Sequence, residues 1–135
     1  MKKILIIPML ILLTGCFGEA GKGYINKTCE KTENINGRSL NTNITIKSKS
    51  GSIETITITE TYDKKIDLTS ITTAKKSEQN LYKTLNGITL EINDNIFTYT
   101  IDKQNADQMI IEKFNIKDEQ HKQIKYYEEN GYTCK

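Results

Sequence analysis

The sequence predicts an α+β domain in which an antiparallel sheet of about five strands carries two helices packed on one face. Two kinds of pattern lead to this prediction. Runs of alternating apolar and threonine residues, separated by short turns, are typical of paired strands. Two other stretches place apolar residues at spacings of three and four, as amphipathic helices do.

The first half of the domain is expected to contain only strands. We predict a first strand from Tyr24 to Asn34 and a turn at Asn36-Gly37. Strands at 42–47 and 52–62 then form a hairpin around a loop that contains Gly51. Isoleucines occupy one face of this hairpin and threonines the other, so we expect the sheet to be covered on one side only.

The second half begins with a helix and a second hairpin. Apolar residues between Ile71 and Leu85 form a helical stripe, and Asn86-Gly87 is expected to end that helix. Residues 88–92 and 97–101 alternate in the manner of strands, with a turn at 93–95 between them.

The last part of the chain is expected to form one more strand and one more helix. The segment 108–114 is predicted as a strand because Met109-Ile110-Ile111 is prone to β-structure. Asp118 is the predicted cap of a final helix that runs from about Glu119 to Asn130, where Asn130-Gly131 ends it.

Residues 1–15 have the features of a secretory signal peptide and not of a folded element. Lys2 and Lys3 precede an apolar run over 4–13, which is about half the length that a membrane-spanning helix needs. Residues 16–23 are rich in glycine and are predicted to form a flexible tether. A single globular domain is expected over 24–135.

The segment Leu13-Thr14-Gly15-Cys16 resembles the lipobox of bacterial lipoproteins. This resemblance implies that the Cys16 thiol receives diacylglycerol, that the chain is cleaved before Cys16, and that acyl chains such as palmitate hold it in a membrane. We therefore expect a protein anchored by lipid to the extracytoplasmic face of the cell membrane. An ordinary secretory signal and a cytosolic chain with an apolar first helix are the alternatives.

The two remaining cysteines, Cys29 and Cys134, can form only one disulfide. Disulfides persist outside the cytoplasm, so we expect this bond to join the first strand to the end of the chain. Two unpaired thiols are the alternative. The spacing does not match the C-x-x-C motif of redox-active pairs.

The charge balance excludes one class of partner. Removal of a leader that contains Lys2 and Lys3 leaves 17 basic and 17 acidic residues. A balanced surface produces no long-range field for nucleic acid, so we expect no nucleic-acid partner. The same balance argues against a polybasic contribution to membrane binding.

No constellation of catalytic or metal-binding residues stands out, so we predict no catalytic residues, no metal and no cofactor. His121 is the only histidine and is expected at the surface. Glu78 interrupts the helical stripe and is expected at its edge, in reach of water; Glu112 is the other carboxylate of note. The seven tyrosines could line a groove for sugars or peptides, although we expect most of them to complete the rim of a small core. They are Tyr24, Tyr62, Tyr82, Tyr99, Tyr126, Tyr127 and Tyr132.

The whole pattern resembles the YehR-like bacterial lipoproteins, a family built on a domain of unknown function. Three features carry the likeness: the lipobox at Cys16, the threonine-rich stretch 42–63 and the closing segment 126–132. The resemblance implies a compact α+β domain outside the cytoplasmic membrane and supplies no catalytic residues.

The expected function is that of a non-enzymatic binding or interaction module at the cell envelope. Its partners would be the membrane, through the lipid anchor, and an envelope protein or cell-wall ligand; we expect a monomer. The alternatives are an enzyme or enzyme inhibitor that acts on cell-wall polymer, and an immunity-type lipoprotein that blocks a surface site.

Overall fold

The computed structural model describes residues 23–35, 37–64 and 67–135. The predicted signal peptide, the lipidation site Cys16 and the tether up to residue 22 lie outside the described residues, as does Asn36 of the predicted turn. The elements are β1 (Tyr24–Ile35), β2 (Arg38–Lys49), β3 (Ser52–Tyr62), α2 (Thr69–Tyr82), β4 (Ile88–Asn93), β5 (Ile96–Asp102), α3 (Gln108–Lys113), α4 (Gln120–Glu129) and β6 (Thr133–Cys134).

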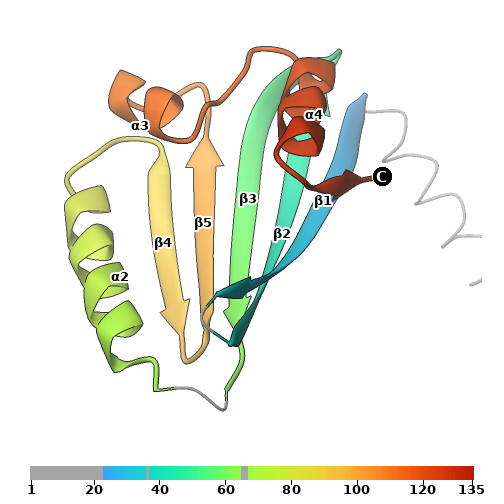
Figure 1. Cartoon of the computed structure of the whole chain (residues 1–135). Coiled ribbons are helices and arrows are strands. Elements are labelled where there is room, and N and C mark those ends of the chain that lie inside the picture. The colour runs from blue at the N-terminus through green and yellow to red at the C-terminus, as the bar shows by residue number, and fades with distance from the viewer. Residues whose placement is uncertain (1–22, 36, 65–66) are drawn as a thin grey trace, which may run out of the picture.

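The predicted α+β fold is confirmed, with six strands and three helices in the described residues. The strands form one antiparallel sheet in the order β4-β5-β3-β2-β1-β6. Figure 1 shows α2 beside β4 at one side of the sheet, α4 in front of β1 and β2 at the other, and α3 at one end. The two longer helices therefore flank the sheet and leave its middle less covered.

Strand register divides the helix-facing side of the sheet into two rows that differ in polarity. The apolar row runs across five strands through Cys29, Ile44, Ile58, Tyr99 and Leu90. The polar row lies two residues nearer the β1–β2 turn on each strand. On β1, β2 and β3 it consists of Lys31, Thr42 and Glu60. Because side chains alternate along a strand, the threonines of β3 point to the opposite side of the sheet.

The centre of the core lies under α3 and α4, on the side of the apolar row that faces away from the polar row. Ile46, Ile56 and Ile101 are fully buried and follow the apolar row in register. Ile110 of α3 and Tyr127 of α4 close over them. The hydrophobic effect thus fixes the register of these strands, and the core extends alongside the polar row through Phe97 of β5, which is fully buried and in register with Glu60.

The segment 108–114 is a helix and not the predicted strand. Its β-prone residues were misleading because tertiary packing on the core overrode their local propensity. In a helix, Ile110 and Phe114 are four residues apart and share one face, which packs on the core. Met109 points away and is 53% exposed.

The final helix ends as predicted but does not begin with the predicted cap. Asp118 makes no capping bond; its carboxylate pairs with Lys103 at 3.0 Å, and the N-cap position belongs to Glu119. The first helical N–H, that of Gln120, instead donates to the Gly51 carbonyl in the β2–β3 turn. At the other end, Gly131 has φ +89° and the backbone forms both hydrogen bonds of a Schellman motif.

Gly87 has the predicted left-handed backbone but a different role. Helix α2 ends at Tyr82, so Gly87 with φ +73° lies beyond its last turn. A Cβ atom at Gly87 would lie 2.3 Å from the Cα of Ala106. The glycine therefore permits close packing of the α2–β4 connection against the segment that leads into α3.

The expected disulfide joins Cys29 and Cys134, which face each other in the β1–β6 ladder. Cys29 is fully buried, and the bond closes a loop with a sequence separation of 105 residues. It fixes the two-residue edge strand β6, and with it Tyr132, to the neighbouring strand β1. No helix in the described residues is long and apolar enough to cross a membrane.

We predict that loss of this disulfide strongly destabilises the domain. Closure of a loop of this length contributes about 4–5 kcal/mol in the chain-entropy description. Reduced protein and the Cys134→Ala variant should therefore unfold at a lower urea concentration than oxidised protein, measured by circular dichroism. Cys134→Ala should show no further change on addition of reductant. Equal midpoints for oxidised and reduced wild-type protein would contradict the prediction.

Candidate functional site

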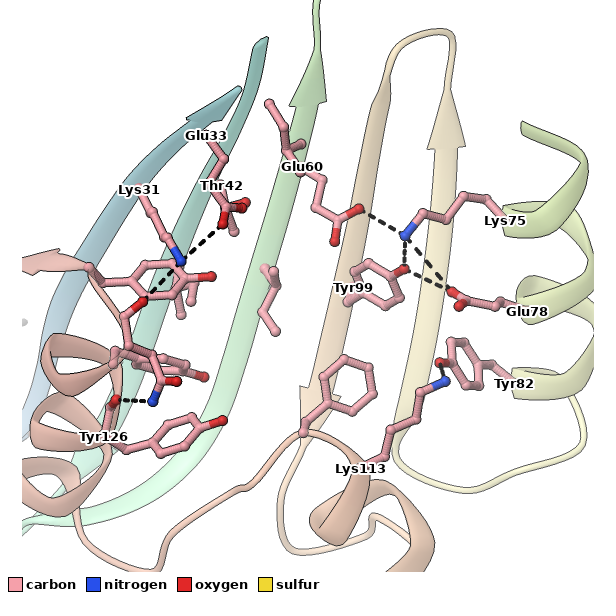
Figure 2. Close-up of a pocket in the computed structure, with 17 residues that line it drawn as sticks. Lys31, Glu33, Thr42, Glu60, Lys75, Glu78, Tyr82, Tyr99, Lys113 and Tyr126 are labelled. Atoms are coloured by element: carbon pink, nitrogen blue, oxygen red, sulfur yellow. Dashed lines mark hydrogen bonds and ion pairs between the residues drawn. The ribbon is translucent and has the colours of Figure 1, made fainter. Parts of the chain in front are cut away.

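A groove of about 490 Å³ opens on the helix-facing side of the sheet, between α2 and α4. Its volume lies in the range of small-molecule sites. The polar row and part of the apolar row form its floor, and Figure 2 shows α2 on one side, α4 on the other and α3 at one end. The lining residues are Lys31, Glu33, Leu40, Thr42, Ile44, Ile58, Glu60, Lys75, Glu78, Tyr82, Tyr99, Lys113, Phe114, Tyr126, Tyr127, Asn130 and Tyr132.

Lys75 is the centre of the best-connected cluster in the groove. Its ammonium lies 2.8 Å from a Glu60 carboxylate oxygen and 4.0 Å from one of Glu78, and it donates to the Tyr99 hydroxyl. The Lys75 side chain is only 14% exposed. Because a poorly solvated ammonium needs counter-charges, the two carboxylates from β3 and α2 are held toward one point.

Tyr99 links this cluster to the floor of the groove. Its hydroxyl donates to Glu78 at 2.8 Å while it accepts from Lys75. Burial, and then the negative charge of Glu60, raises the pKa of Tyr99 above its ordinary value of 10.0. The hydroxyl therefore remains protonated and keeps its donor role at physiological pH.

A second charged cluster lies on the β1 side of the groove. Lys31 pairs with Glu33 at 3.0 Å and donates to the Asn130 carbonyl at 3.0 Å, at the end of α4. The same ammonium lies 5.3 Å from the centre of the Tyr132 ring. Both contacts stabilise the ammonium. The negative end of the helix dipole attracts a cation, and so does the face of an aromatic ring.

The end of the groove near α3 is built from aromatic rings and a lysine. Lys113 donates to the Tyr82 hydroxyl at 2.6 Å and lies over the rings of Tyr82 and Phe114. Tyr126 enters from α4, and its hydroxyl accepts a hydrogen bond from the Asn115 amide at 3.1 Å. This bond fixes the orientation of the Tyr126 ring, which is half-buried.

The structure places the three titratable residues that the sequence singled out at different locations. Glu78 lies at the edge of the α2 stripe with a side chain 36% exposed, as predicted, and it belongs to the groove. His121 is at the surface as predicted, with a side chain 73% exposed. Glu112 is exposed outside the groove and accepts a hydrogen bond from Gln108. Within the described residues, no three metal-ligating side chains form a cluster.

The tyrosines divide between the two predicted roles. Five line the groove, which fits the alternative of a binding surface, and several of these also contact the core. Tyr24 is exposed on the far side of β1 from Cys29, where Lys47 lies over its ring. The five in the groove are Tyr82, Tyr99, Tyr126, Tyr127 and Tyr132.

Sequence reasoning missed three lysines and two glutamates of the groove. Lys31, Lys75 and Lys113 come from β1, α2 and α3, and only the fold brings them to one surface. One signal was present for Glu60: it follows Ile56 and Ile58 at the same spacing and so interrupts the apolar face of β3, while the threonines continue on the other face. A carboxylate on a core-facing strand position predicts a paired charge or a site.

Comparison with known protein families, with curated proteins and with solved structures found no match to this chain. The likeness to the YehR-like lipoproteins therefore stays a prediction from the sequence.

We predict that Lys75→Met lowers the free energy of unfolding by about 1–3 kcal/mol, because Glu60 would lose its counter-charge in a poorly solvated place. Lys76→Met is the matched control: Lys76 is the next residue on α2, is exposed, and should change stability by less than about 0.5 kcal/mol. The double variant Glu60→Gln/Lys75→Met should recover part of the loss. Urea unfolding measures all three, and equal stability of the two lysine variants would exclude a structural role for the Lys75 cluster.

We also predict that the domain loses stability as pH rises above about 10. Burial is the largest cause that raises the pKa of Tyr62, Tyr99, Tyr127 and Tyr132 in the folded state. Above the ordinary tyrosine pKa of 10.0, the unfolded chain releases these protons while the folded chain keeps them. The stabilisation is therefore complete below pH 10 and is lost at higher pH.

This alkaline loss is measured by urea unfolding at a series of pH values and by the ultraviolet absorbance of tyrosinate. Tyr99→Phe should make the decline of stability with pH shallower. Tyr24→Phe, which removes an exposed ring outside the groove, controls for the loss of one chromophore. Titration of all seven tyrosines in protein that remains folded would contradict the prediction.

Proposed function

We propose that this protein is a lipid-anchored binding module at the outer face of the cell membrane, and that the groove between α2 and α4 holds its ligand. The sequence of residues 1–16 supports the anchor, because a short apolar leader is followed by the lipobox-like Leu13-Thr14-Gly15-Cys16. The groove supports the binding role, and it is the observation on which the proposal depends.

The chemistry of the groove favours a small ligand that has both ring faces and hydroxyl groups. Rings of Tyr126 and Tyr132 offer apolar faces, while Thr42, Asn130 and the paired charges offer hydrogen-bond donors and acceptors. Sugars have this combination of C–H faces and hydroxyls, and binding sites with a few placed polar groups among aromatic rings suit them. We therefore propose a carbohydrate of the cell envelope as the ligand.

Preorganisation is the second argument for binding. The Tyr126 hydroxyl is held by Asn115, and the Lys31 ammonium is held by Glu33 and the Asn130 carbonyl. Side chains that are already fixed lose little further conformational entropy when a ligand arrives, so more of the contact energy contributes to affinity.

An enzyme that acts on cell-wall polymer is the second candidate. It is favoured by Glu60 and Glu78, two carboxylates that approach the same lysine in the groove. Their shared counter-ion, Lys75, fits a structural or ligand-binding pair better than a general acid and base. Release of reducing sugar from purified peptidoglycan by wild-type protein, but not by Glu60→Gln, would favour this candidate over the binding module.

The anchor is tested by the predicted effect of Cys16→Ser. Without the thiol, no thioether to diacylglycerol can form, so the protein should be released from membranes or remain unprocessed. Cell fractionation and intact-mass measurement detect both outcomes, with the wild-type protein as the reference. A natural product that carries no acyl mass would contradict the anchor.

The binding role is tested with N-acetylglucosamine as a neutral probe. Titration of the isotope-labelled mature chain with Cys16→Ser should shift resonances of groove residues in nuclear magnetic resonance spectra. At roughly 0.3 kcal/mol per non-hydrogen atom, one sugar ring should bind with a Kd on the order of 1 mM.

A pair of tyrosine variants makes this test specific for the groove. Tyr126→Ala removes a ring at the groove wall and should raise the Kd about fivefold, which corresponds to roughly 1 kcal/mol. Tyr24→Ala removes an exposed ring on the opposite side of β1 and should leave the Kd unchanged. Resonance shifts confined to the threonine face of the sheet, or the same Kd for both variants, would contradict the assignment of this groove as the sugar-binding site.

A further inference from the structure

One of the three groove lysines has no ion pair with any carboxylate in the part of the chain that the structure describes. Lys31 pairs with Glu33, and Lys75 pairs with Glu60. Lys113 also lines the groove, but no carboxylate among the described residues lies within ion-pair distance of it. The groove therefore contains a cation that is available to a ligand.

The contacts of Lys113 hold its ammonium in place without removing its charge. The ammonium donates to the Tyr82 hydroxyl at 2.6 Å and lies 5.0 Å from the centre of that ring and 5.8 Å from the centre of the Phe114 ring. An ammonium has three donors, and this hydroxyl uses one. Aromatic faces attract the cation but leave its remaining donors free.

A second lysine lies against the aromatic wall of the groove. Lys117 lies 5.0 Å from the centre of the Tyr126 ring and also has no carboxylate partner among the described residues. Glu112, which precedes Lys113 in the sequence, lies outside the groove and accepts a hydrogen bond from Gln108, and Asp118 pairs with Lys103. Figure 2 places Glu33 and Glu60 toward the other end of the groove, whereas Glu78 lies on α2 above Tyr82, where it accepts a hydrogen bond from the Tyr99 hydroxyl and lies 4.0 Å from the Lys75 ammonium.

We propose that the groove selects sugars that carry an anionic group, either a carboxylate or a phosphate, and that Lys113 binds that group while the sugar ring contacts the aromatic wall. This proposal rests on the proposed function, because it names the ligand class of the same groove. A fixed, unneutralised cation beside aromatic rings complements a ring with one attached negative charge.

Three probes with the same sugar ring test the proposal. They are N-acetylglucosamine, which is neutral, N-acetylmuramic acid, which adds a carboxylate, and N-acetylglucosamine 6-phosphate. With the mature Cys16→Ser chain, one or both acidic probes should bind with a Kd about tenfold lower than the neutral sugar, a ratio typical of one charge-assisted hydrogen bond. The ratio between the two acidic probes identifies which anion the site prefers.

Variants of Lys113 assign the preference to this side chain. Lys113→Met keeps the apolar stem over the rings but removes the charge, so the acidic probes should fall to the affinity of the neutral one. Lys113→Arg keeps the charge and should retain most of the preference. Lys76→Met removes an exposed lysine of α2 that lies outside the groove and has no ion-pair partner among the described residues, and it should change nothing.

The outcomes separate this inference from the function that it rests on. Equal affinity for the neutral and acidic probes, or an acidic preference that survives in Lys113→Met, would overturn the role of Lys113 and leave the sugar-binding groove intact. If no probe shifts groove resonances, the sugar-binding function fails and this inference fails with it.

Discussion

The width of the sheet relative to its helices is the constraint from which the rest of the structure follows. Six strands at about 4.8 Å spacing make a sheet of roughly 24 Å, while a packed helix covers about 10 Å. The two longer helices, α2 and α4, stand at opposite sides of this sheet. They cannot meet over its middle, and the short helix α3 closes only one end. A concave, partly open surface is therefore a consequence of the element lengths.

Strand register determines what this open surface presents. A shift by one residue in β2 or β3 would turn Thr42 and Glu60 to the far side and bring threonines and asparagines inward. The buried isoleucines of the adjacent rows oppose such a shift, because they would be exposed by it. Hydrophobic burial in the adjacent rows thus fixes the position of the charged groups of the polar row, and the Cys29–Cys134 bond adds Tyr132 to the same surface.

The strands and their order of appearance could be predicted from the sequence because alternation in β2, β3, β4 and β5 is a local pattern. The helix α4 ended where Asn130-Gly131 indicated, since a Schellman motif is also local. The α3 segment was assigned wrongly because the choice between strand and helix for Ile110 and Ile111 depended on how the segment packs against the core, and that is a property of the whole fold. The groove could not be predicted for the same reason: Lys31, Lys75 and Lys113 are far apart along the chain, and no short motif joins them.

Net charge conceals the feature on which the proposed selectivity of the groove depends. The chain from Cys16 onward carries equal numbers of acidic and basic residues, and such a balance indicates only that long-range attraction is weak. Specific recognition depends on charges that remain uncompensated at short range after the protein has paired the others. Glu60 and Glu78 are used to hold Lys75, and Glu33 holds Lys31, whereas Lys113 is held by a hydroxyl and two aromatic rings. A protein that is neutral as a whole can therefore present one oriented positive charge beside ring faces, and this local arrangement gives it a basis for preferring an acidic sugar over a neutral one.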